Sequence, residues 1–264
     1  MKTNRIEARL EELKNKNEKA FITYITAGLP NMEATADIIK AQNGADIIEL
    51  GIPFSDPIAD GPVIQQASYE AIQNGATLNK AFELMKKLRN EQVEKPIVFM
   101  LYYNTIVNCG IENFVNKCRE AGVDGLIIPD LPFEEQEDLS NALKGDDTTI
   151  LIQLVSPVSK NRIPEILKDA RGFVYCVSSM GVTGQAADFH KEVINYLTFV
   201  KKESKIPVMM GFGIREAKDV KPMKDIIDGA IVGSHFINLM RENNFDPNAA
   251  KEYTEKFKRE VNSL

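Results

Sequence analysis

The sequence predicts an α/β fold of the (β/α)8 or TIM-barrel type, in which eight parallel strands close into a ring with helices outside. Three observations predict it. The chain has 264 residues, a length at which α/β barrels commonly form one domain, so we expect a single domain over residues 1–264. Short apolar runs recur eight times, and amphipathic stretches separate them. This alternation indicates a parallel sheet, and eight repeats in one domain favour a closed barrel over an open sheet.

The eight predicted strands have few polar positions, as expected of parallel strands that are covered on both faces. They are Phe21–Thr26, Asp46–Leu50, Ile97–Tyr102, Gly125–Pro129, Ile150–Val155, Phe173–Val177, Val208–Met210 and Ala230–Val232. Apolar spacing of three and four residues predicts helices over Asn31–Gln42, Thr77–Asn90, Ile111–Ala121, Glu134–Leu143, Ile163–Asp169, Lys191–Lys202, Arg215–Met223 and Pro247–Val261. We expect one extra helix, Met1–Leu13, before the first strand, and a short helix that begins near Ser234 after the eighth.

Composition excludes several classes of protein. The hydrophobic fraction of 44% and charged fraction of 27% are typical of a globular protein, and the net charge of −6 gives no reason to expect a nucleic-acid partner. Cys109, Cys118 and Cys176 form no CxxC pair, and with the two histidines they form no metal-binding pattern. We find no signal peptide and no apolar run long enough to span a membrane, so we expect a cytoplasmic protein.

The most informative segment is ELGIPFSDPIADGP, at residues 49–62. Glu49 interrupts an apolar strand near its end, where barrel enzymes place their chemistry. A strand-held carboxyl group in a dry pocket is expected to have a raised pKa, whereas Asp60, on the following loop, is expected to stay ionised and accept a hydrogen bond. Asp56 and Asp60 could instead only cap the following turn, but an unpaired buried Glu49 is costly and indicates function.

Glycine turns follow the last three predicted strands, at Gly181–Gly184, Gly211–Gly213 and Gly233. Glycine lets backbone N–H groups approach an anion closely, and a helix that begins at Ser234 would add a favourable dipole. The loops after strands seven and eight are a recurrent phosphate site in barrels. Any one of these glycines is ordinary turn chemistry, but three at matching strand ends predict a phosphate-binding site.

These motifs together resemble the tryptophan synthase alpha chain family along the whole chain. The resemblance rests on AFITYITAGLP (20–30), ELGIPFSDPIADGP (49–62), YYN (102–104), PDLP (129–132), GVTG (181–184), GFGI (211–214) and Gly233-Ser234. It implies a lyase that cleaves indole-3-glycerol phosphate to indole and glyceraldehyde 3-phosphate. Glu49 would protonate indole C3 and help deprotonate the glycerol hydroxyl, and Asp60 would accept a hydrogen bond from the indole N–H.

The resemblance also implies the substrate pocket and the partner. The implied substrate-binding residues are Tyr175, near Glu49; Thr183, in the GVTG motif; Gly184, Gly213, Gly233 and Ser234 for the phosphate; and Phe212, Ile64, Met100 and Ile127 for the indole ring. Asp56, Asn104 and Asp130 match positions near a contact with a beta subunit in an alpha2beta2 heterotetramer. No cofactor is expected in this chain, since pyridoxal phosphate belongs to the beta subunit.

The chain departs from the usual family pattern in four places. Thr23-Tyr24 stands where Pro-Phe is usual, Leu29 replaces a loop aspartate, Thr105 stands where proline is common, and Gln185-Ala-Ala-Asp188 follows the GVTG motif. The hydroxyl of Tyr24 would lie near the indole pocket. Three alternatives remain open: a lyase that works without a beta subunit, a non-catalytic activator of one, or another phosphate-binding barrel enzyme such as a sugar-phosphate isomerase.

Overall fold

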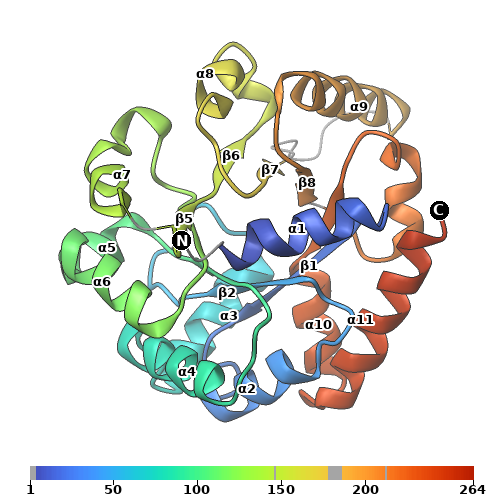
Figure 1. Cartoon of the computed structure of the whole chain (residues 1–264). Helices are drawn as coiled ribbons and strands as arrows, with labels where there is room; N and C mark the ends of the chain where they lie inside the picture. Colours follow the sequence, from blue (N-terminus) through green and yellow to red (C-terminus); the bar gives the residue numbers. More distant parts are fainter. Residues whose placement is uncertain (1–3, 146, 178–185, 212) are drawn as a thin grey trace.

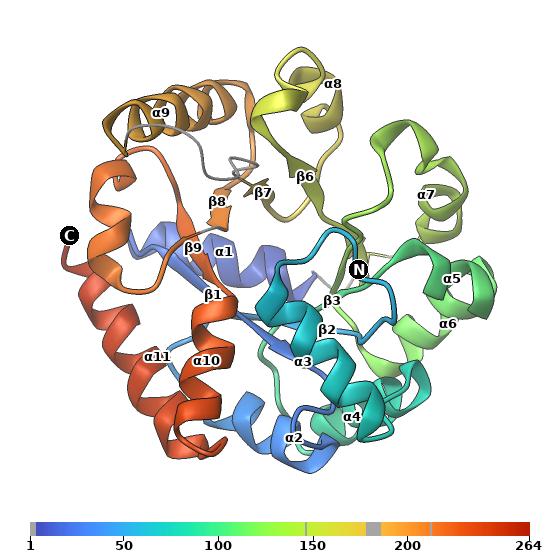
Figure 2. The same ribbon diagram turned by 180° about the vertical axis from the view of Figure 1, so that it is seen from behind.

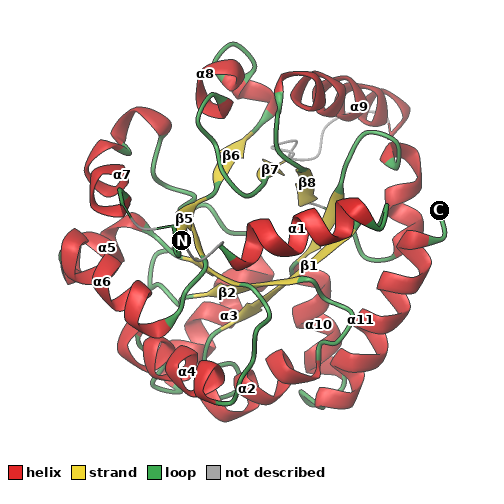
Figure 3. Cartoon of the chain, viewed as in Figure 1, coloured by secondary structure: helices red, strands yellow, loops and turns green. Residues whose placement is uncertain are grey.

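The computed structural model describes residues 4–145, 147–177, 186–211 and 213–264. Its strands form one parallel sheet in the order β5-β4-β3-β2-β1-β9-β8-β7-β6. The two ends of this order, β5 and β6, are separated in the chain only by Ile152, so the sheet closes on itself. The ring of strands lies inside a ring of helices (Figures 1 and 3), which confirms the predicted barrel.

The strands follow the sequence prediction, with the fifth barrel strand divided in two. They are β1 (Ala20–Thr26), β2 (Ile47–Gly51), β3 (Ile97–Met100), β4 (Gly125–Ile127), β5 (Ile150–Leu151), β6 (Gln153–Val155), β7 (Val174–Val177), β8 (Val208–Gly211) and β9 (Gly229–Val232). Every strand pairing is parallel. The carboxyl ends of all strands therefore lie at the same face of the barrel. Figure 2, which is turned by 180° from Figure 1, shows this face.

The helices include two that the sequence analysis did not predict, α3 and α5, which begin soon after the ends of β2 and β3. The α-helices are α1 (Arg5–Asn15), α2 (Met32–Ala41), α3 (Pro62–Gln73), α4 (Leu78–Asn90), α5 (Tyr103–Cys109), α6 (Ile111–Ala121), α7 (Glu137–Leu143), α8 (Ile163–Leu167), α9 (Ala186–Glu203), α10 (Ser234–Glu242) and α11 (Pro247–Asn262). Short 3-10 helices are η1 (Phe133–Glu135), η2 (Pro157–Ser159) and η3 (Ala217–Met223). The predicted helix at Arg215–Met223 is thus a 3-10 helix, because Pro222 lacks the N–H that an α-helix needs there.

The barrel interior is built in layers from residues at matching register. Ile22 of β1 pairs with Ile47 of β2, and both are fully buried in the lower interior. One layer nearer the mouth, Tyr24 pairs with Glu49. A tyrosine and a carboxyl group therefore replace the apolar side chains just below the face where barrel enzymes carry out chemistry.

Three buried or partly buried aspartates tie strands together at the opposite face. Each precedes a strand, and its Oδ2 accepts a hydrogen bond of 2.7 Å from a backbone N–H at the start of the strand before it. The pairs are Asp46 with Phe21, Asp124 with Ile97, and Asp228 with Val208. Because each carboxylate bridges two strands, this end of the barrel is fixed by side chains as well as by the sheet.

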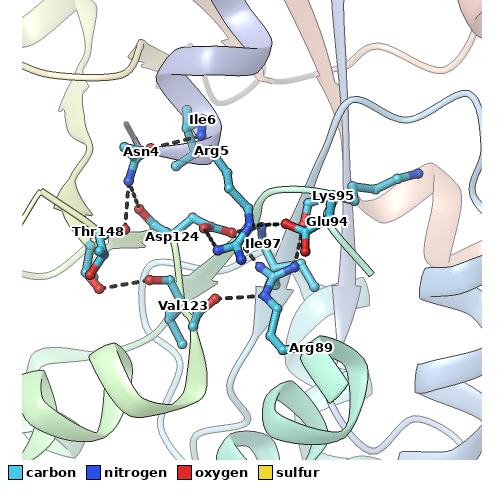
Figure 4. Close-up of polar contacts among 12 residues, drawn as sticks. Asn4, Arg5, Ile6, Arg89, Glu94, Lys95, Ile97, Val123, Asp124 and Thr148 are labelled. Carbon is cyan, nitrogen blue, oxygen red and sulfur yellow. Dashed lines mark hydrogen bonds and ion pairs between the residues drawn. The ribbon is translucent and has the colours of Figure 1, made fainter. Parts of the chain in front are cut away.

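Helix α1 crosses this lower face (Figure 1) and is attached to the same aspartates. Arg5 bonds to Asp124 at 3.0 Å, and Arg9 bonds to Asp46 at 2.7 Å. Figure 4 shows Asp124 between Arg5 and Arg89, with the amide of Asn4 donating to its carbonyl oxygen. The predicted extra helix thus closes the bottom of the barrel.

Among the described helices, none is long and apolar enough to cross a membrane.

Candidate active site

Glu49 is the third residue of β2, shortly before the mouth loop, and its side chain is completely buried. Neither carboxyl oxygen has a hydrogen-bond partner among the described residues. This burial raises the pKa of Glu49 from 4.5 to about 8. At neutral pH Glu49 therefore holds a proton that it can donate.

Asp60 lies on the loop between β2 and α3 and faces a cavity at the mouth. Its Oδ2 accepts a hydrogen bond of 2.9 Å from the Tyr102 hydroxyl, which itself accepts one of 2.9 Å from the Ala59 N–H. The ring of Tyr102 stacks on Phe54 at 5.0 Å between centroids. Burial raises the pKa of Asp60, and the hydrogen bond from Tyr102 opposes this rise. Tyr102 thus fixes both the loop and its carboxyl group.

The cavity has a volume of about 810 Å³ and opens at the carboxyl ends of the strands. Tyr175, Met100 and Ile64 line it together with Asp60. Glu49 is not among its lining residues. Burial raises the pKa of the Tyr175 hydroxyl, and the charges of Glu49 and Asp60 raise it further. The two carboxyl groups are therefore close to one tyrosine, with one at the cavity surface and the other beneath it.

The far end of the cavity carries the backbone amides expected for an anion. Gly213, Gly233 and Ser234 line it, and Ser234 is the first residue of α10. Gly213 has a φ of +71°, a left-handed conformation that favours glycine. The first amides of a helix have no partner within the helix and point out of its N-terminus, where they favour negative charge. Arg215 lines the same region and supplies a positive charge.

The remaining sequence-predicted pocket residues divide into two groups. Ile127 is fully buried in the barrel interior as the register partner of Met100, and it does not line the cavity. Thr183, Gly184 and Phe212 lie outside the described residues, as does Gln185.

The three residues assigned to a partner contact lie on consecutive loops and helices of the mouth. Asp56 is exposed in the loop after β2, Asn104 is exposed on α5 after β3, and Asp130 is exposed after β4. Asp130 accepts a hydrogen bond of 2.9 Å from the Tyr103 N–H, which joins two of these segments. The structure therefore brings all three to one side of the rim.

Sequence reasoning did not assign a role to Tyr102, although it quoted this residue within a motif. Its partner Asp60 is 42 residues away, so spacing along the chain could not connect them. The only available signal was an aromatic residue with a polar tip at the end of a predicted strand.

Among the described residues, no group of three histidines, cysteines or acidic residues could hold a metal ion.

The barrel, its carboxyl groups at the mouth and the amide-lined end of the cavity define an enzyme class. The class is a (β/α)8-barrel enzyme that acts on a small anionic molecule by acid–base chemistry.

Comparisons with known proteins identify the family. The sequence model described as "Tryptophan synthase alpha chain" matches residues 10–264. A tryptophan synthase alpha chain from Lachnospira eligens is 64% identical over 263 residues, which are 98% of this chain and 100% of that protein. Another from Methanocaldococcus jannaschii is 46% identical over 253 residues, 94% of this chain and 89% of that protein. The crystal structure of tryptophan synthase subunit alpha from Legionella pneumophila has a TM-score of 0.87 at 33% identity and covers 100% of both chains.

The chain belongs to the tryptophan synthase alpha chain family. It is a lyase of tryptophan biosynthesis, and its reaction is the cleavage of indole-3-glycerol phosphate.

Proposed function

We propose that Glu49 and Asp60 carry out the cleavage of indole-3-glycerol phosphate in the 810 Å³ cavity. Glu49 gives its proton to indole C3, and the ring nitrogen takes up the positive charge. The resulting Glu49 carboxylate accepts the proton of the glycerol hydroxyl next to the ring. The carbon–carbon bond then breaks, its electrons return to the ring, and indole and glyceraldehyde 3-phosphate are released. Glu49 ends protonated, as it began.

The burial of Glu49 supports this role because a general acid works best when its pKa is close to the working pH. The pKa of about 8 keeps the proton on Glu49 until a substrate atom can receive it. The same buried setting makes the ionised form a strong base, which suits removal of the hydroxyl proton.

Asp60 suits the second role, that of a hydrogen-bond acceptor for the indole N–H. Its carboxyl group faces the cavity, and Tyr102 occupies only Oδ2. As the ring nitrogen becomes positive, attraction to an ionised Asp60 grows. This interaction is stronger in the transition state than in the ground state, which is the condition for catalysis.

The phosphate is proposed to lie on the amides of Gly213, Gly233 and Ser234. The family resemblance adds Gly184 to the phosphate site and Thr183 to the substrate-binding residues, and both lie outside the described residues. The support in the structure is the cavity end at the first turn of α10. Ile64 and Met100 are proposed to cover the apolar ring. The family resemblance assigns Phe212 to the same ring, and this residue lies outside the described residues.

Members of this family function with a beta subunit, and we propose that this chain forms an alpha2beta2 heterotetramer in the cytoplasm. Exposed Asp56, Asn104 and Asp130 on one side of the mouth support a contact there. The acid–base steps need no cofactor in this chain, so we assign pyridoxal phosphate to the beta subunit alone. Addition of beta subunit is expected to raise the rate of cleavage by the alpha chain.

The single observation that carries the proposal is the fully buried carboxyl group of Glu49, which has no hydrogen-bond partner among the described residues. The test is indole release from indole-3-glycerol phosphate by wild type, Glu49→Gln and Asp60→Asn, each with and without beta subunit. Glu49→Gln is expected to lose about 10²–10⁴-fold or more, because it removes general acid–base catalysis. Asp56→Asn, which changes an exposed carboxyl group on the same loop, is the matched control for the isolated chain.

The outcomes separate the alternatives. A Glu49→Gln variant as active as wild type would refute the assigned roles. Rapid cleavage that beta subunit does not change would indicate a lyase that works alone. Stimulation of a beta subunit by an alpha chain that releases no indole would indicate a non-catalytic activator.

A further inference from the structure

Tyr24 occupies an unusual position for a tyrosine, inside the barrel at the level of Glu49. It is the register partner of Glu49, and only 4% of its surface is exposed. Its ring lies over Gly51: a Cβ atom at position 51 would be 2.0 Å from the Tyr24 hydroxyl oxygen. The ring therefore fits only because residue 51 is glycine, and its polar tip is held at the upper end of β2.

The hydrogen bonds of this hydroxyl group are incomplete. The oxygen accepts one long hydrogen bond, 3.4 Å, from the Thr26 hydroxyl. Among the described residues, Thr26 is the one hydrogen-bond partner of this hydroxyl group, and it lies near the outer limit of hydrogen-bond distance. A buried polar group with only one long hydrogen bond is poorly satisfied, so this hydroxyl group is expected to donate to a better acceptor when one becomes available.

Glu49 has the complementary deficiency. Both of its carboxyl oxygens are buried, and neither receives a hydrogen bond from the described residues. The titratable groups around this pair are Asp60 on the mouth loop, Tyr102 after β3 and Tyr175 on β7. Asp60 already accepts a hydrogen bond from Tyr102 at Oδ2, whereas Glu49 has no donor to either oxygen among the described residues.

We propose that Tyr24 is a positioning residue, whose hydroxyl group donates a hydrogen bond to the Glu49 carboxylate and turns it toward the cavity. The bond forms when Glu49 has given up its proton, since an ionised carboxyl group is acceptor-only and accepts the stronger hydrogen bond. Tyr24 does not exchange its own proton. It stabilises the base form of Glu49 between the two proton transfers, and this role rests on the function proposed above.

The test is Tyr24→Phe, which keeps the ring over Gly51 and removes only the hydroxyl group. The pKa of Glu49 is measured directly from the pH dependence of its carboxyl carbon NMR signal, assigned with Glu49→Gln. Loss of one hydrogen bond to the ionised form is expected to raise this pKa by about one unit, a tenfold change in acid dissociation. The kcat for indole release should fall about tenfold, and its pH profile should shift upward with the NMR titration.

The control is Tyr69→Phe, which removes a hydroxyl group from an exposed tyrosine on α3 and should change neither quantity. A second variant, with 3-fluorotyrosine at position 24, keeps the hydroxyl group and makes it a stronger donor, so the Glu49 pKa should fall. An unchanged Glu49 titration in both Tyr24 variants would overturn the proposal. A shifted titration in a protein that releases no indole would support the hydrogen bond and refute the lyase roles.

Discussion

Replacing Glu49 with glutamine should make the protein progressively more stable than wild type as the pH rises. In the folded protein Glu49 keeps its proton up to about pH 8, whereas the unfolded chain releases it near the ordinary value of 4.5. Between these pH values unfolding releases a proton, so the free energy of unfolding of wild type falls as pH rises. Below about pH 4.5 both states are protonated and the penalty is absent.

The size of the effect follows from the difference between the two pKa values. A difference of about 3.5 units at 1.36 kcal/mol per unit corresponds to about 5 kcal/mol over the whole window. Between pH 5 and pH 8 the expected change is about 3.5 kcal/mol, because the ends of the window are then only partly crossed. Any local opening that hydrates the carboxylate reduces these figures, so they are upper limits.

The assay is urea unfolding of wild type and Glu49→Gln at pH 5, 6, 7 and 8. The free energy of unfolding of Glu49→Gln minus that of wild type should increase steadily across the series. Asp56→Asn provides the matched control, because it replaces an exposed carboxyl group on the mouth loop with the same kind of amide. A constant difference for Glu49→Gln would show that Glu49 is hydrated or paired in the folded protein, and the reasoning would be refuted.

Three further predictions concern the mouth and base of the barrel. Tyr102→Phe removes the donor to Asp60 and the acceptor for the Ala59 N–H, so kcat/KM for indole release should fall about tenfold and the thermal midpoint should fall slightly. An unaltered kcat/KM would contradict this role. Gly213→Ala places a side chain at φ +71°, so it should lower the free energy of unfolding by about 1 kcal/mol and raise KM; an unchanged KM would argue against a phosphate at this turn. Asp124→Asn replaces a buried carboxylate that bonds Arg5, Arg89 and a strand amide. Urea unfolding should show that the free energy of unfolding falls by about 3 kcal/mol, while kcat is preserved. A fall below about 1 kcal/mol would show that the asparagine amide replaces the ion pairs.

The barrel could be predicted from the sequence because the same strand-and-helix pattern is repeated along the chain. Each buried strand is a short apolar run, and each is followed by a stretch with helical spacing, so an error in one element leaves the pattern intact. The missed helix α3 begins at Pro62, directly after a loop rich in proline and glycine, and the loop composition concealed its start. Pro222 changed the type of helix in η3 through one missing N–H, an effect that apolar spacing does not register.

The candidate site was predictable only where one residue was out of place in its local pattern. Glu49 could be singled out because a carboxyl group within an apolar strand is costly. The contact between Tyr102 and Asp60, and that between Tyr24 and Gly51, could not be foreseen from spacing. Both depend on how neighbouring strands are aligned, and alignment is a property of the closed sheet rather than of any single segment.

The strand-bridging aspartates at the base have a consequence for how this enzyme could change. Asp46, Asp124 and Asp228 anchor neighbouring strands at the end of the barrel farthest from the cavity. Loops at the mouth can therefore be lengthened, shortened or given new side chains without loosening these anchors. Natural evolution can therefore change the shape of the pocket while the lower half of the barrel stays the same. Directed evolution for substrates with altered ring substituents can do so too.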